Sequence, residues 1–87
     1  MTVTSLSLFA RIEWCRSQST HAQTEPEIEG WRAEEDGLRD ALLHRDHTKL
    51  YRYGPPGVFV RYAMGFEDGH ALMRLAWVAR HVATSRQ

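Results

Sequence analysis

Apolar and polar residues alternate from Lys49 to Met64 in two short runs, which flank the tetrapeptide Gly54-Pro55-Pro56-Gly57. Both runs are rich in Tyr, Val and Phe, and glycine with proline between such runs is typical of a hairpin turn. The pattern therefore predicts a β-hairpin over residues 49–64. Because strand side chains alternate between the two faces, one face would be apolar and belong to the core: Tyr51, Tyr53, Val58, Val60, Tyr62 and Met64.

The other face of this hairpin would carry Arg52, Phe59 and Arg61. An aromatic ring between guanidinium groups can stack on a base while the arginines bind phosphates. Binding of nucleic acid by this face is therefore an alternative function. It is the less favoured one, because the net charge is zero and the pI is near 7.0, whereas nucleic-acid-binding domains are usually basic.

The N-terminal segment from Thr4 to Trp14 also alternates, with every apolar residue except Phe9 in period two. This favours a strand. A helical interpretation would align Leu8, Ile12 and Cys15 but scatter the other apolar residues around the helix. The polar residues 16–24 that follow are expected to form a surface loop.

Two helices are expected further along. The first follows a Thr24 cap and has its apolar side at Ile28, Trp31, Leu38, Ala41 and Leu42, with a possible break at Asp36-Gly37. Glu34 and Glu35 border that side and are expected to pair with Arg52 or Arg61. The second helix would be capped by Asp68 and span residues 69–84. Its buried arc would comprise Leu72, Leu75, Ala76, Val78, Ala79, Val82 and Ala83.

These elements predict a single α+β domain over residues 1–87, in the order β-α-β-β-α. A three-stranded, mainly antiparallel sheet would have two helices on one face. The alternative order is α-α-β-β-α, in which the N-terminal segment is helical. No family resemblance is evident.

Composition indicates the compartment. The chain is 43% apolar and 25% charged, as in an ordinary soluble protein, and it has no apolar run of about 18 residues, so no membrane partner is expected. The N-terminus lacks the basic start and apolar block of a signal peptide. The single Cys15 cannot form an internal disulfide. A cytoplasmic location is therefore expected.

Charge is unevenly distributed along the chain. Residues 25–40 hold seven acidic and two basic residues, a balance of −5, whereas residues 41–87 hold seven basic and three acidic residues, a balance of +4. Such polarity can steer a charged partner or favour self-association.

No catalytic motif is present, and no cofactor is expected. His44 and His47 have a spacing of i, i+3 that could hold a metal if the first helix continued that far, but no motif supplies further ligands. Metal or ligand binding is therefore only a third possibility, and enzymatic activity is not expected.

The strongest functional signal is on the second helix, where Met73 and Trp77 lie opposite the predicted buried arc, among Arg74, Arg80 and His81. Trp, Met and Arg are enriched at protein interfaces. We therefore expect a non-enzymatic protein-interaction function. The chain would act as an accessory subunit, an inhibitor or an antitoxin-like regulator that occupies a partner's surface, and it could form a homo-oligomer. A small chain made by a bacterium or phage would suit this role.

Overall fold

The computed structural model describes residues 3–85, and the side chains of residues 7–82, as a helical bundle. Helix α1 spans Val3–His21, α2 spans Glu25–Leu43, α3 spans Thr48–Arg52 and α4 spans Pro56–Ser85. No strand forms within the described residues. The predicted α+β fold with its three-stranded sheet is therefore wrong, although the alternative interpretation of the N-terminal segment as a helix is correct.

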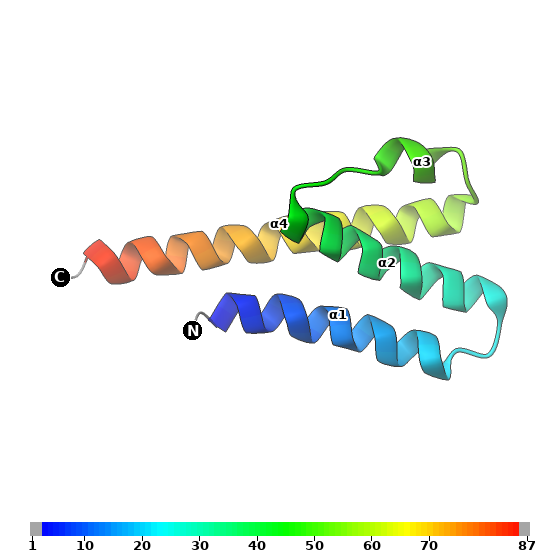
Figure 1. The fold of residues 1–87 in the computed structure, drawn as a ribbon, viewed down its shortest axis with the longest axis horizontal. Helices are drawn as coiled ribbons and strands as arrows, with labels where there is room; N and C mark the ends of the chain where they lie inside the picture. Colours follow the sequence, from blue (N-terminus) through cyan, green and yellow to red (C-terminus); the bar gives the residue numbers. More distant parts are fainter. Residues whose placement is uncertain (1–2, 86–87) are drawn as a thin grey trace.

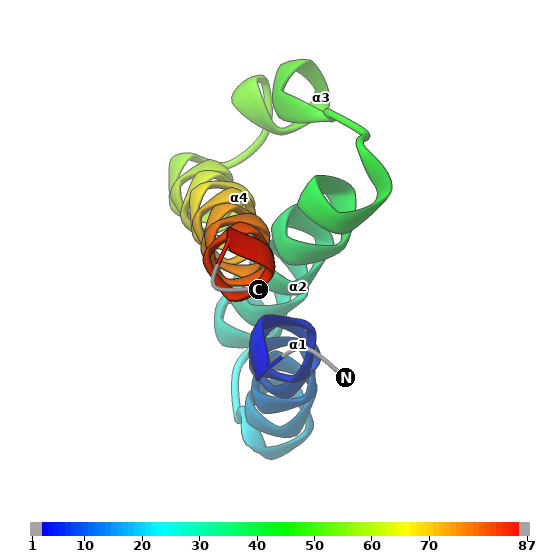
Figure 2. The same cartoon turned by 90° about the vertical axis from the view of Figure 1, so that its left-hand side faces the viewer.

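The three long helices pack around one core (Figures 1 and 2). Helix α1 runs antiparallel to α2, whereas α4 runs in the same direction as α2, because the connection that contains α3 carries the chain back along the bundle (Figure 1). The most extensive packing joins α2 to α4. The C-terminal part of α4 continues past the end of α2 (Figure 1).

The tetrapeptide expected to form a hairpin turn starts a helix instead. Pro56 is the first residue of α4, and the carbonyl of Pro55 accepts hydrogen bonds from the backbone N–H groups of Val58 and Phe59 at 3.1 and 3.0 Å. Proline is favourable at the first helical position because its φ suits the helix and its missing N–H would have no intrahelical acceptor. The β-prone residues that follow become helical because one side of this segment packs against α2.

The N-terminal segment is helical for a similar reason. Leu8, Ile12 and Cys15, the set that a helix aligns, are all buried, at 2%, 4% and 0% exposure. Together with Leu38 of α2 they form the central core cluster. The strand interpretation placed Trp14 on the same apolar face, but Trp14 is about half exposed, as is Phe9, the exception to the alternation. Helix α1 continues to His21, so most of the predicted loop over residues 16–24 is helical as well.

Helix α2 confirms its predicted start. The hydroxyl of Thr24 accepts a hydrogen bond from the N–H of Glu27 at 3.3 Å, and Pro26 lies in the first turn. The helix ends at Leu43, where His44 adopts the left-handed conformation with φ 56°. The suggested break at Gly37 does not occur, because this glycine lies at a close contact between helices.

Three glycines, Gly37 of α2 with Gly65 and Gly69 of α4, let the two backbones touch. A Cβ atom on Gly65 would overlap the backbone carbonyl of Glu34, and one on Gly37 would overlap the backbone of Tyr62. A Cβ atom on Gly69 would lie 2.7 Å from the Cβ of Ala41. The approach of α2 to α4 therefore requires residues without side chains. The same close contact explains why α4 continues as a helix through residues 65–69, where the sequence predicted a turn.

The predicted buried arc of the second helix is only partly correct. Ala76 is buried and Leu72 is half-buried against the core, but Leu75, Val78, Ala79 and Val82 are exposed. The side chain of Ala83 lies outside the described residues. Asp68 does not cap a helix. Its Oδ2 atom forms an ion pair with Arg11 Nη2 at 3.0 Å.

Replacing Gly65 by Ala should lower the free energy of unfolding by at least about 2 kcal/mol, because the new methyl group can be accommodated only if two backbones separate. The matched control is Gly57→Ala, at the start of the same helix, where an added Cβ would meet no atom within 4 Å. This control should leave stability unchanged or raise it slightly. Urea unfolding of both variants measures the difference, and equal stabilities would contradict the proposed role of the contact.

Candidate functional site

A charged cluster lies at the centre of the bundle, around the carboxylate of Glu34. This side chain is only 3% exposed. Its Oε2 accepts hydrogen bonds from Arg11 Nη2 at 3.2 Å and from Cys15 Sγ at 3.3 Å, and its Oε1 lies 3.2 Å from Arg61 Nη2. Groups from α1, α2 and α4 therefore meet at one carboxylate. The predicted pairing of Glu34 with Arg61 is confirmed, whereas Glu35 pairs with Arg16 and Arg39.

The thiol of Cys15 is held in its neutral form. Burial, together with the hydrogen bond to the Glu34 carboxylate and its negative charge, raises the pKa of Cys15 from 9.0 to about 12. A thiolate is the reactive form of cysteine. Cys15 is therefore a structural hydrogen-bond donor and not a nucleophile.

A second polar cluster fixes α3 onto the bundle. Asp40, 2% exposed, accepts hydrogen bonds from the Tyr62 hydroxyl at 2.6 Å and from His47 Nδ1 at 2.7 Å. One turn earlier on α2, Asp36 accepts the Tyr51 hydroxyl at 2.6 Å, and the rings of Tyr51 and Tyr62 stack with centroids 4.2 Å apart. Burial and the bond to Asp40 raise the pKa of Tyr62, so the phenol stays protonated as a donor.

The two weak metal candidates, His44 and His47, lie in different surroundings, and only His47 belongs to this second cluster. His44 ends α2 and is exposed, whereas His47 is bound to Asp40 through its Nδ1 atom. Within the described part of the chain, no group of three or more His, Cys, Asp or Glu side chains is arranged to hold a metal ion.

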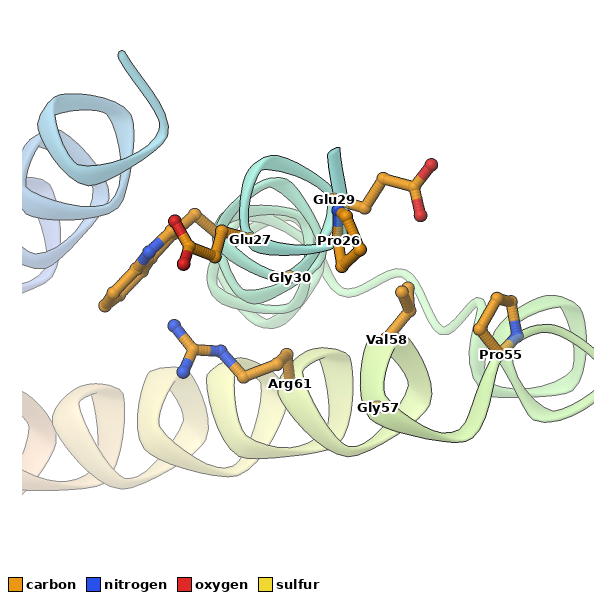
Figure 3. A pocket seen from close by; sticks show the side chains of 9 residues that line it. Pro26, Glu27, Glu29, Gly30, Pro55, Gly57, Val58 and Arg61 are labelled. Atoms are coloured by element: carbon orange, nitrogen blue, oxygen red, sulfur yellow. The ribbon is translucent and has the colours of Figure 1, made fainter. Parts of the chain in front are cut away.

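A pocket of about 480 Å³ opens between the starts of α2 and α4 (Figure 3). Its walls are formed by residues of both helices and of the loop before α4: Pro26, Glu27, Glu29, Gly30, Trp31, Pro55, Gly57, Val58 and Arg61. In Figure 3 the carboxylate of Glu29 points away from Arg61.

The cation at this pocket is already engaged within the protein. The guanidinium carbon of Arg61 lies 4.0 Å from the centre of the Trp31 ring, and its Nη2 faces Glu34. Both Nε and Nη2 of Arg61 are buried without a hydrogen-bond partner. A ligand would have to displace the arginine from an aromatic ring and a buried carboxylate. The pocket is therefore best explained as a gap beside a structural contact.

The three residues of the nucleic-acid alternative do not form a common face. Arg52 is exposed at the end of α3, whereas Phe59 and Arg61 lie on α4. Residues two apart on a helix point to opposite sides, and the guanidinium of Arg61 is turned inward onto Trp31. The stacking surface expected from a hairpin is absent from the described structure because the hairpin does not form.

An apolar groove of about 200 Å³ lies between α1 and α4, at the end of the bundle beyond the charged cluster. It is lined by residues of α1 and α4 and by one residue of α2: Leu8, Phe9, Leu42, Leu72, Met73, Ala76 and Arg80. Of the predicted partner-binding residues, Met73 and Arg80 therefore line a real concavity.

Trp77 lies beside this groove and is 55% exposed. The ring of His81 stacks on its indole with centroids 3.6 Å apart, which holds the exposed tryptophan in place. Arg74, also exposed, lies further around the helix. The structure thus brings Met73, Trp77, Arg80 and His81 onto one side of α4.

Sequence reasoning missed the α1 residues Leu8 and Phe9 of the groove, because that segment was assigned to a strand. The helical alignment of Leu8, Ile12 and Cys15 was the available signal. Comparison of the chain with models of protein families, with curated proteins and with solved structures gives no match. Among the described helices, none combines the length and the apolar character needed to cross a membrane.

Replacing Glu34 by Gln should lower the free energy of unfolding by roughly 3 kcal/mol or more, because Arg61 would lose its buried counter-charge. Glu29→Gln, at an exposed position on the same helix, is the control and should change stability by less than about 0.5 kcal/mol. Urea unfolding measures both. A Glu34→Gln variant as stable as the control would show that the buried cluster contributes little to the fold.

The raised pKa of Cys15 makes stability depend on pH. Between pH 9.0 and about 12 the unfolded thiol loses its proton while the folded thiol keeps it. The free energy of unfolding should therefore fall as pH rises, by up to about 1.4 kcal/mol per unit. Cys15→Ala should reduce this slope between pH 9.0 and 10.0, and the slope that remains comes from Tyr51 and Tyr62, whose pKa values are also raised above the ordinary 10.0. Unfolding curves over this interval test it, and identical slopes for both proteins would contradict the assignment.

Proposed function

We propose that this protein is a non-enzymatic interaction protein that occupies the surface of a protein partner through one side of α4. The observation that carries the proposal is the apolar groove between α1 and α4, next to the exposed Trp77. Concave apolar surfaces beside a rigid aromatic ring are typical positions for the few residues that dominate binding.

The chemistry of this surface indicates the kind of partner. No acidic residue follows Asp68, whereas Arg74, Arg80 and Arg86 do, so the C-terminal part of the chain is basic. The groove accepts an apolar side chain, with Met73 as an adaptable wall. The partner would therefore present an apolar side chain flanked by acidic groups. Such a role suits an accessory subunit, an inhibitor or an antitoxin-like regulator.

Two features of the described residues support binding over catalysis. The buried ionisable groups Glu34 and Asp40 are each saturated by partners from within the chain. The thiol of Cys15 is buried and protonated. The buried polar side chains thus hold the helices together, whereas the exposed surface around the groove is apolar and basic.

Replacing Trp77 by Ala should weaken partner binding by at least about 2 kcal/mol, because an anchor residue is lost, while stability changes by less than about 0.5 kcal/mol. The matched control is Trp14→Ala, since Trp14 is 54% exposed, close to the 55% of Trp77, but lies outside the groove. The partner is first captured from the native host, with and without nuclease, and its affinity for each purified variant is then measured.

Capture that disappears after nuclease treatment would indicate a nucleic acid and overturn the proposal. Equal affinities of the Trp77→Ala and Trp14→Ala variants for a captured protein would show that binding uses another surface. A large loss of stability in Trp77→Ala, with unchanged affinity, would make Trp77 an ordinary packing residue.

A further inference from the structure

A second apolar surface runs along the opposite side of α4. Its members recur along most of the helix, and we call them the outer stripe: Val60, Met64, Glu67, Ala71, Leu75, Val78 and Val82. The large apolar members are between 41% and 60% exposed. In Figure 2 the side of α4 that faces away from α2 carries no other helix of the described chain.

The spacing of the outer stripe is regular. Successive members are four, three and four residues apart from Val60 to Ala71, and the same spacing repeats from Ala71 to Val82. An eleven-residue repeat corresponds to about 3.67 residues per turn, close to the natural 3.6 of an α-helix. The stripe therefore follows α4 almost straight from Val60 to Val82.

Helix α4 is consequently apolar on two sides. Its inner side packs on α2 through Gly65 and Gly69, and its outer stripe is open. A helix with apolar residues all around is normally enclosed by other elements. The described chain encloses only one side of α4, so the outer stripe has the character of a surface that another helix covers.

We propose that the outer stripe is covered by the α4 helix of a second copy of this chain, in an antiparallel dimer with its two-fold axis at Ala71. The positions are symmetric about this residue. Val60 and Val82 lie eleven residues to either side, Met64 and Val78 seven, and Glu67 and Leu75 four. In an antiparallel pair each residue therefore meets its counterpart, and the small Ala71 lies at the crossing.

Charge complementarity supports the second copy as the occupant. The one charged member of the outer stripe, Glu67, would lie next to Leu75 and Arg74 of the other copy. In a two-fold antiparallel pair, each flank of one helix faces the same flank of the other helix. Glu67 and Arg74 lie on the same flank of α4, so each can reach the other across the interface. The symmetry would thus form the Glu67 to Arg74 pair twice. A parallel pair in register would instead place Glu67 next to Glu67 and the two Arg74 side chains on opposite sides of the interface, so that no Glu67 to Arg74 pair forms.

This dimer goes beyond the proposed function because it uses a different side of α4. Residues 77 and 71 are six apart, which places Trp77 well away from the centre of the outer stripe. A dimer would therefore leave the groove open and present two copies of it. An interface of this kind is isologous and closes at two subunits.

The first test is the mass of the full chain in solution, measured by sedimentation equilibrium at micromolar concentrations. We expect twice the 10.1 kDa of one chain. Leu75→Asp should raise the dissociation constant more than tenfold, since a carboxylate would enter the apolar contact. The matched control Leu50→Asp changes a 73% exposed leucine of α3, outside the stripe, and should keep the dimer.

A monomeric wild-type protein would overturn the proposal, as would a dimer that survives Leu75→Asp or a mass larger than that of a dimer. Circular dichroism shows whether each variant keeps its helices. Trp77→Ala should leave the dimer intact, so failure of the dimer and failure of the partner surface are distinguishable.

The second test addresses the charge pair. Glu67→Arg alone and Arg74→Glu alone should each weaken the dimer severalfold, because like charges would face each other twice. An equal mixture of these two variants should restore association, since each mixed dimer contains two opposite-charge pairs. No recovery on mixing would contradict the pairing even if the stripe mediates association.

The third test distinguishes the two orientations by disulfide formation. Met64→Cys mixed with Val78→Cys should give the mixed disulfide faster than either variant gives its own, because disulfides need Cα atoms within roughly 7 Å. The native Cys15 is fully buried and does not compete. Faster formation of either self-disulfide would indicate a parallel dimer and overturn the antiparallel arrangement.

Discussion

The contact between Glu34 and Gly65 is the constraint on which the bundle depends. The backbone of Glu34 touches α4 where Gly65 has no side chain, and its carboxylate binds groups from both α1 and α4. The close approach of two backbones fixes the separation of α2 and α4, and the ionic contacts fix the position of α1 against both. A buried ion pair adds little net stability compared with an apolar contact. Its value here is geometric, because one carboxylate can be satisfied by Cys15, Arg11 and Arg61 only when all three long helices are in register.

The sequence revealed the start of α2, its apolar side and the pairing of Glu34 with Arg61, because caps and helical periodicity are local signals. The same local reasoning failed between residues 49 and 64. There, β-prone residues and Pro55-Pro56 resembled a hairpin, although proline also begins helices. The decisive information was not local: Gly37, Gly65 and Gly69 are far apart in the sequence and become meaningful only when two helices meet. In α1 the mistake was to expect the whole alternating set, Trp14 included, to share one buried face, when a small domain leaves much apolar surface exposed.

The sequence identified the surface around Trp77 by an argument that was only partly correct. Trp77 was singled out as an aromatic residue away from the buried side, and it is half exposed in the structure. The arc thought to lie opposite it, in the core, is itself largely exposed beyond Leu72. Both observations have one physical origin, since α4 continues past the end of α2 and has no helix of the described chain on its outer side (Figures 1 and 2). A sequence pattern can show that a helix is apolar on two sides, but only the packing shows which side its own chain covers.

Stability and recognition are therefore assigned to different parts of the molecule. The parallel course of α2 and α4 requires a return connection, and α3 is fixed there by Asp36 and Asp40, which accept the hydroxyls of Tyr51 and Tyr62. These polar contacts make the side of the bundle where α3 packs against α2 and α4 a structural one. At the end of the bundle that holds the groove, the exposed part of α4 carries apolar and basic groups. Substitutions at that end can alter association without releasing a buried charge, which is the physical condition under which a binding surface changes while the fold persists.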